Sequence, residues 1–533
     1  MKYLDSRPIA RFFHWGLHNW GMKLLVGASL TCVIFWLGVM SLVNITLPAR
    51  FSVLIVGVMV VGVPTTLYFM RGVSYEKAVV IMLLTLPLLY GFVLELGGNF
   101  RIPYLFAVLA FGLCLLQGKL RKFPTDCAIL LLFTFVIYAV FSTALTFGVD
   151  TSGPREAAGF RLSPLRSVIQ AAQLILMVLT FIVTINYVTS FERLSRFSNL
   201  IFWSTAALIL YGVYDFVAAL FDLHFYSIIY DLSYYAGGSD SPSFSAGGVT
   251  IPRPRATLGE PLDLSIFLLF GLSFAIASLS IEKSAVLRVV KICFIFLGCL
   301  LFLVANSRSS LLAIPVIFAV MLWLAPGLAS RLKILLAVMV VYLMVAFVIF
   351  PAAGGKGGAL FPFQYFQQRM GSLQYIGANL RGEPAGVPIG RGYDTPFSIF
   401  RDHPIFGVGL GNYPFVYSEF VGSPVKVLGS PFSLYFRLLT ELGVIGTSFF
   451  LLFVATILWR LLRVIRRSTD SRLRPFALAS LVAIVGVMIG RLGLDGLYTD
   501  NYIWVMFGVG IVIPWLAQRE EKCAIAEPGL VTN

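Results

Sequence analysis

Arginines recur in certain segments between the long apolar runs of this chain. Arginine presents a planar fork of donors that matches phosphate oxygens, and it stays charged at every relevant pH. A group of arginines beside lipid therefore suggests a site for a lipid-linked phosphate or diphosphate. The alternative for each one alone is that its side chain only reaches to the membrane interface or solvates a loop. The candidates are Arg253, Arg255, Arg308, Arg369, Arg381, Arg391 and Arg401.

Arg308 differs from the other candidates in the segment that carries it. It lies in 306–310, Asn-Ser-Arg-Ser-Ser, which is a tight connection between two apolar runs. A charge there lies at the bilayer boundary or slightly below it, where charges are costly and functional by default. Its competing role is to cap the ends of two helices.

Acids and bases that could serve the same site are few, and Glu260 and His403 are our candidate catalytic residues. Pro404 follows His403, which favours a turn-forming role for this histidine instead. The six cysteines show neither zinc-type pairing nor a disulfide framework. We therefore expect no metal and no cofactor. The remaining acidic candidates are Asp402, Glu419, Glu441 and Asp495.

The segment 406–412, Phe-Gly-Val-Gly-Leu-Gly-Asn, resembles a glycine loop that cradles phosphate with bare backbone amides. It lacks the strand and helix that flank such a loop in nucleotide-binding folds. The favoured interpretation is a tight turn packed at the membrane surface.

The composition predicts the elements that position these residues. Hydrophobic residues make up 58% of the 533 residues and charged residues 12%, against about 25% charged in soluble domains. Apolar runs of about 20 residues recur, each long enough to cross a bilayer as a helix, and they lack the alternation of barrel strands. We predict an all-α polytopic membrane protein with about 14 transmembrane helices. The predicted spans are 22–46, 51–70, 78–97, 102–118, 126–147, 167–188, 198–221, 261–281, 288–305, 309–325, 334–351, 432–458, 476–494 and 502–517.

Basic residues set the predicted orientation of these spans. Alternate short loops carry them, from Arg71 and Lys77 through to the arginines between 460 and 474, so the positive-inside rule puts both termini in the cytoplasm. The net charge of +15 thus belongs to membrane topology, and we expect no nucleic acid partner.

The same topology predicts the domain organisation. Residues 1–351 form helices 1 to 11 with outward loops 148–166 and 223–260, and 352–431 form a large structured outer loop. Residues 432–518 form helices 12 to 14, and 519–533 form a cytoplasmic tail. The large loop is too long for a mere connector. We expect short amphipathic helices within it, near 363–375 and 395–402.

Four blocks of the sequence resemble the O-antigen ligase and O-antigen polymerase superfamily of bacterial envelope glycosyltransferases. They occur in family order and on the expected side of the membrane. The blocks are Arg-Ala-Thr-Leu-Gly-Glu-Pro at 255–261, the 306–310 turn, the 401–412 segment, and the 434–446 segment with its Gly-x-x-Gly pair.

The resemblance implies a GT-C-like, metal-independent glycosyltransferase of the bacterial inner membrane with a periplasmic active site. Its donor would be an oligosaccharide linked to undecaprenyl diphosphate, and a chain-length regulator or flippase of the same pathway could be a partner. By matching blocks, Arg255 and Arg308 are expected to hold the diphosphate, with Arg391 or Arg401 as a third cation.

One departure from the family pattern separates polymerase from ligase. Ligases usually carry a histidine eleven residues ahead of the first glycine of the Gly-x-x-Gly pair. Counting back from Gly443 gives Phe432, and phenylalanine cannot accept a proton. This favours a polymerase in which Glu260 or His403 substitutes as base. A ligase acting on lipid A core or another acceptor remains an alternative, as does a flippase of lipid-linked sugars without chemistry.

Overall fold

The computed structural model describes about three fifths of the chain. The predicted spans 22–46, 51–70 and 334–351 and the predicted helix near 363–375 lie outside the described residues. So do Arg369 and Arg381. The described residues are 74–90, 93–95, 99–120, 126–148, 165–220, 243–246, 249–305, 308–324, 391–421, 433–468, 470–493 and 496–526.

Eight helices of the described part are long and apolar enough to cross a membrane. Each coincides with a predicted span, which confirms a multi-pass helical membrane protein, whereas the total of about fourteen spans stays a prediction. The helices are α6 (Cys127–Ser142, continued by η3, Thr143–Gly148), α8 (Leu165–Tyr187), α9 (Phe191–Leu220), α11 (Pro261–Leu279), α12 (Ala285–Ala305), α19 (Leu434–Arg467), α20 (Leu473–Gly490) and α21 (Asn501–Ala526).

Three further predicted spans form shorter helices, and one of them corrects a prediction. Besides α5 (Ile102–Leu116) and α13 (Arg308–Leu324), α4 covers only Tyr75–Leu88 of the predicted span 78–97. The chain then forms an antiparallel hairpin of β1 (Val93–Glu95) and β2 (Asn99–Arg101). Tyr90, just after α4, and Arg101, the last residue of β2, both reach the carboxylate of Asp500, which holds the chain in the hairpin where the predicted span would continue.

A second hairpin lies in the predicted outer loop 223–260. It pairs β3 (Ser243–Ala246) with β4 (Val249–Pro252), so the fold is predominantly helical rather than purely all-α. The predicted helix 395–402 is confirmed as α17 (Arg391–Asp402), which α18 (Tyr413–Val421) follows. Ile399, Tyr413 and Val416 form a small core between α17 and α18.

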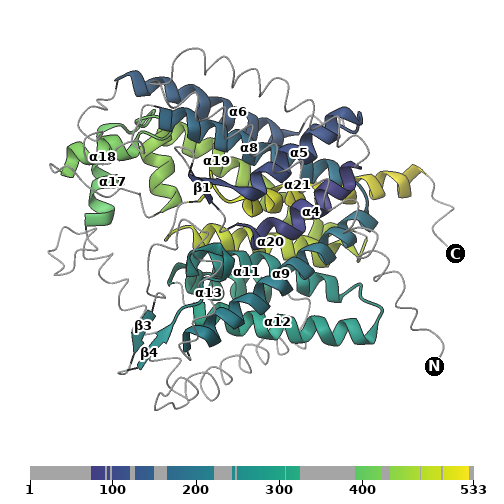
Figure 1. The fold of residues 1–533 in the computed structure, drawn as a ribbon. Coiled ribbons are helices and arrows are strands. Elements are labelled where there is room, and N and C mark those ends of the chain that lie inside the picture. The colour runs from purple at the N-terminus through teal and green to yellow at the C-terminus, as the bar shows by residue number, and fades with distance from the viewer. Residues whose placement is uncertain are drawn as a thin grey trace, which may run out of the picture.

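The helices pack in a bundle with α11 and α20 at its centre (Figure 1). On one side α20 contacts α19 and α21, which pack on α6 and α8, and on the other side α11 contacts α9 and α12. The positive-inside rule assigns one end of the bundle to the outside of the membrane, and we call this end the outer end. The two hairpins, α17 and α18 lie toward this end (Figure 1).

Candidate functional site

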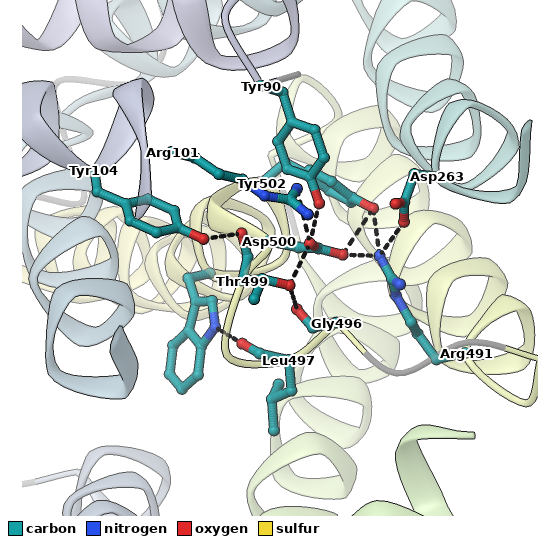
Figure 2. A network of polar contacts seen from close by, with 11 residues as sticks. Tyr90, Arg101, Tyr104, Asp263, Arg491, Gly496, Leu497, Thr499, Asp500 and Tyr502 are labelled. Atoms are coloured by element: carbon teal, nitrogen blue, oxygen red, sulfur yellow. Dashed lines mark hydrogen bonds and ion pairs between the residues drawn. The ribbon is translucent and has the colours of Figure 1, made fainter. Parts of the chain in front are cut away.

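A buried polar network ties together the outer ends of α4, α5, α11, α20 and α21 (Figure 2). Its centre is Arg491, directly after α20. The Nη2 of Arg491 donates to Asp263 Oδ1 at 3.1 Å and to Asp500 Oδ2. The other oxygen of Asp500 accepts from Tyr90 Oη and from Arg101 Nη1, the latter at 3.4 Å. Residues far apart in the sequence therefore share one carboxylate.

The network is balanced in charge and excluded from solvent. Its two arginines and two aspartates are each at most 4% exposed. The guanidinium of Arg101 also lies over the Tyr90 ring, 3.5 Å from its centroid. Removing an ion pair from water costs free energy that offsets much of its Coulomb attraction. Buried networks therefore persist where further hydrogen bonds satisfy their charged groups. Since its charges match internally, the network links helices rather than presenting a net charge to a ligand.

The turn that carries Arg255 is anchored beside this network. The backbone amides of Arg255 and Ala256 donate to Asp215 Oδ2 at 2.8 and 3.0 Å, and the hydroxyl of Thr257 donates to the carbonyl of Pro87 at 2.6 Å. Asp215 near the end of α9 thus caps the short helix η7 (Ala256–Leu258), which leads directly into α11. These bonds fix the backbone on which Arg255 stands.

Arg253 connects this turn to the neighbourhood of Arg308. Its Nε donates to the carbonyl of Ala305 at 3.1 Å, and Ala305 is the last residue of α12. Helix α13 begins at Arg308, whose side chain lies outside the described part. The side chain of Arg253, two residues before the 255–261 block, therefore contacts the end of α12, three residues before α13 begins at Arg308.

Glu260 lies in this neighbourhood, at the N-cap of α11, as a residue that is exposed overall but whose carboxyl is partly surrounded by protein. Surrounding protein withholds water from the carboxyl and raises its pKa above the ordinary value, while Arg255 and Arg253 act in the opposite direction. A raised pKa brings a carboxylate closer to the range in which a general base works best. Among the described residues, no three His, Cys, Asp or Glu side chains gather so as to hold a metal ion.

The glycine segment 406–412 forms backbone hydrogen bonds with the outer part of α19. The amides of Val408 and Gly409 donate to the carbonyls of Thr440 and Glu441, both at 2.8 Å. Gly407, Gly409 and Gly411 all have positive φ, which glycine adopts without strain. The interpretation as a tight packed turn is confirmed, and the amides of Val408 and Gly409 are used within the protein rather than offered to phosphate.

Gly443 supplies the other half of this contact. It interrupts α19 with φ 61° and ψ −167°, and a Cβ built on Gly407 would lie 2.6 Å from its nitrogen. The segments 401–412 and 434–446 therefore interlock through glycines that leave no room for a side chain.

Comparison with known families agrees with these segments. Residues 293–451 match the family described as O-antigen ligase. Over this part of the chain the match supports the resemblance to the O-antigen ligase and polymerase superfamily. The match covers the start of α13, the glycine segment and Gly443, which confirms the predicted resemblance. No curated protein matches the chain.

Other predicted site residues lie on α17 or directly after it. Figure 1 places α17 apart from α13 and from the β3–β4 hairpin. Arg401, Asp402 and His403 are exposed. The backbone of His403 serves the turn, since its amide donates to Ile399 and its carbonyl accepts from Gly407. These contacts fit the turn-forming interpretation of His403. The side chain of Arg391 lies outside the described part.

Sequence reasoning missed the residues of the buried network. Arg101, Asp263, Arg491 and Asp500 were not selected, although three lie in or beside predicted spans, where an ionisable group signals function. Arg437 was missed as well. Its Nε lies 3.3 Å from Glu441 Oε2, and its guanidinium lies 4.8 Å from the centroid of the Tyr498 ring.

Proposed function

We propose that the chain is a membrane glycosyltransferase that polymerises undecaprenyl-diphosphate-linked polysaccharide repeat units on the periplasmic face of the bacterial inner membrane. The observation that carries this proposal is the hydrogen bond from Arg253, two residues before Arg255, to Ala305 at the end of α12, three residues before α13 begins at Arg308. Arginines suited to a diphosphate and a carboxylate suited to a base then come from adjacent segments. A flippase of the same pathway would supply the donor at this face.

In the proposed reaction an acceptor hydroxyl attacks the anomeric carbon of the donor sugar. The bond from that carbon to the diphosphate oxygen breaks, the proton passes to Glu260, and the lipid diphosphate leaves. Arg255 and Arg308 neutralise the charge that develops on the leaving group. Such stabilisation is often the largest single contribution to catalysis, and guanidinium groups can supply it without a metal ion.

The polymerase assignment rests on Phe432, which stands where ligases of the superfamily carry a histidine. The second candidate is a ligase that moves the glycan to lipid A core or another acceptor, and the description of the matched family favours it. The two differ in their products. A ladder of lengthened lipid-linked chains identifies a polymerase, and one defined product on an added acceptor identifies a ligase.

The test is transfer by the purified protein in EDTA, with undecaprenyl-diphosphate-linked oligosaccharide as donor and gel and mass spectrometric readout. We expect Arg255→Ala and Arg308→Ala each to lower turnover by about a hundredfold, the usual effect of removing one donor to developing charge. The matched control is Arg288→Ala, since Arg288 is an exposed arginine bonded to the Glu282 carbonyl at the opposite end.

Two outcomes would overturn the proposal. Full turnover by folded Arg308→Ala would exclude the assigned role of this residue. Absence of turnover by the wild type with every acceptor, together with movement of the lipid across proteoliposome membranes, would identify a transporter.

A further inference from the structure

Arg491 contacts the first turn of α11 through its Nη2. Its Nη2 contacts Asp263, Asp500 and Tyr502. Asp263 lies in the turn that begins at Glu260, so the position of Glu260 depends on this ion pair. Through Asp500 the same nitrogen is linked to Arg101 and thus to the start of α5.

The backbone around Arg491 also contacts the first turn of α13. A Cβ built on Gly493 would lie 2.7 Å from Ser309 Oγ, and one on Gly490 would lie 2.8 Å from Ile266 Cγ1 of α11. The end of α20 therefore lies between the starts of α11 and α13. Whatever fixes this end fixes the spacing between Glu260 and the residue before Ser309, which is Arg308.

We propose that Arg491 is a positioning residue for the transfer reaction. It holds Glu260 at the start of α11 at a fixed spacing from Arg308 at the start of α13. This inference rests on the proposed function, because that function assigns the base and the diphosphate ligand to these two positions. Reacting groups need such fixed geometry, since a displacement of about 1 Å can cost a hundredfold in rate.

The first test compares Arg491→Met with Arg491→Lys in the transfer assay. We expect Arg491→Met to lower kcat by about a hundredfold with little change in KM, because the base and the diphosphate ligand are displaced relative to each other. Lysine should restore most of kcat, since its one nitrogen carries three donors for the acceptors that Nη2 now serves. Equal loss in both variants would overturn the inference.

Arg460→Met is the matched control at the other end of the bundle. Arg460 also forms an ion pair that joins helices, with Asp126 before α6, yet it lies away from the proposed site. We expect this variant to keep its kcat. A loss of kcat in Arg460→Met as large as that in Arg491→Met would mean that the effect reports stability alone.

A second pair of variants tests the inference without touching the ion network. Gly493→Ala places a methyl group against Ser309 at the start of α13. Gly486→Ala instead places one farther along α11 and α13, against Leu269 and Ile317. We expect Gly493→Ala to lower kcat at least tenfold more than Gly486→Ala. Equal kcat values in the two variants would overturn the inference, even if Arg491→Met did not fold.

The last test separates this inference from the proposed function. Spin labels on Glu260→Cys and Arg308→Cys, in a background without the native cysteines, report the spacing by double electron–electron resonance. We expect Arg491→Met to shift or broaden the distance and Arg460→Met to leave it unchanged. An unchanged distance overturns the positioning role while wild-type turnover still supports the function. A shifted distance without wild-type turnover overturns the function and leaves the mechanical role of Arg491.

Discussion

The two ends of the helix bundle hold their charges differently. At the inner end, an ion pair that joins two helices is partly exposed. Arg193 pairs with Glu76 at 2.5 Å, and these side chains are 33% and 40% exposed. At the outer end, Arg101, Arg491 and Asp500 belong to one network with a shared carboxylate and almost no exposure. The pair of Arg193 with Glu76 is partly open to solvent, whereas the network at the outer end is closed to it.

This difference indicates where geometry matters most. Exposed ion pairs contribute about 0–1 kcal/mol, so the pair of Arg193 with Glu76 can vary at little cost. A buried network contributes little net stability, because desolvation offsets its attraction, but removal of one member leaves an uncompensated charge. Its effect is to fix relative positions, and it lies beside the turn and the helix start that carry the candidate site.

The largest expected difference between the two ends is in stability. Asp500→Asn should lower the free energy of unfolding by about 3–5 kcal/mol, because it leaves Arg101 and Arg491 with a single buried carboxylate. Glu76→Gln at the inner end should cost less than about 1 kcal/mol. Unfolding of the purified proteins in detergent measures both. Comparable losses would contradict the distinction between the ends.

Glycine-to-alanine substitutions should also cost more stability at the outer end than at the inner end. Gly443→Ala at the outer end introduces a methyl group at positive φ against the Ile405 carbonyl and Gly407, and we expect a loss of about 3 kcal/mol. Gly118 also has positive φ, but nothing lies within 4 Å of its built Cβ, so Gly118→Ala should cost about 1–2 kcal/mol. Unfolding midpoints of the two variants, measured side by side, test this order.

The transmembrane helices could be predicted because a helix that crosses lipid needs apolar side chains along its whole length. Apolar runs of sufficient length leave the backbone no alternative to a helix in lipid, and the described spans follow these runs closely. The early end of α4 could not be predicted. The hairpin that follows α4 is held by Tyr90 and Arg101, which reach Asp500, a partner that is 410 residues away from Tyr90.

The candidate site was predictable in part for a related reason. The arginines at 255 and 308 and the carboxylate at 260 were selected from residue type and from family resemblance. Which of the other charged residues would meet was set by tertiary packing. Asp495, which lies outside the described residues, was considered while Asp500 was not, although Asp500 binds Arg491, because a single sequence does not show which acids will pair with Arg491.

The smallest expected effect is an opposite response of two carboxyl groups to pH. Withheld water raises the pKa of Glu260, so its contribution to stability falls as pH rises from the ordinary 4.5 through the raised pKa. Burial alone would raise the pKa of Glu282, but hydrogen bonds from Lys291 and Ser284 lower it, and that stabilisation is lost as pH falls through the lowered pKa. At about pH 7, Glu260→Gln should therefore gain stability and Glu282→Gln should lose it. Unfolding measured from about pH 4 to 7 gives both differences. A loss of stability in Glu260→Gln at neutral pH would contradict the raised pKa of Glu260.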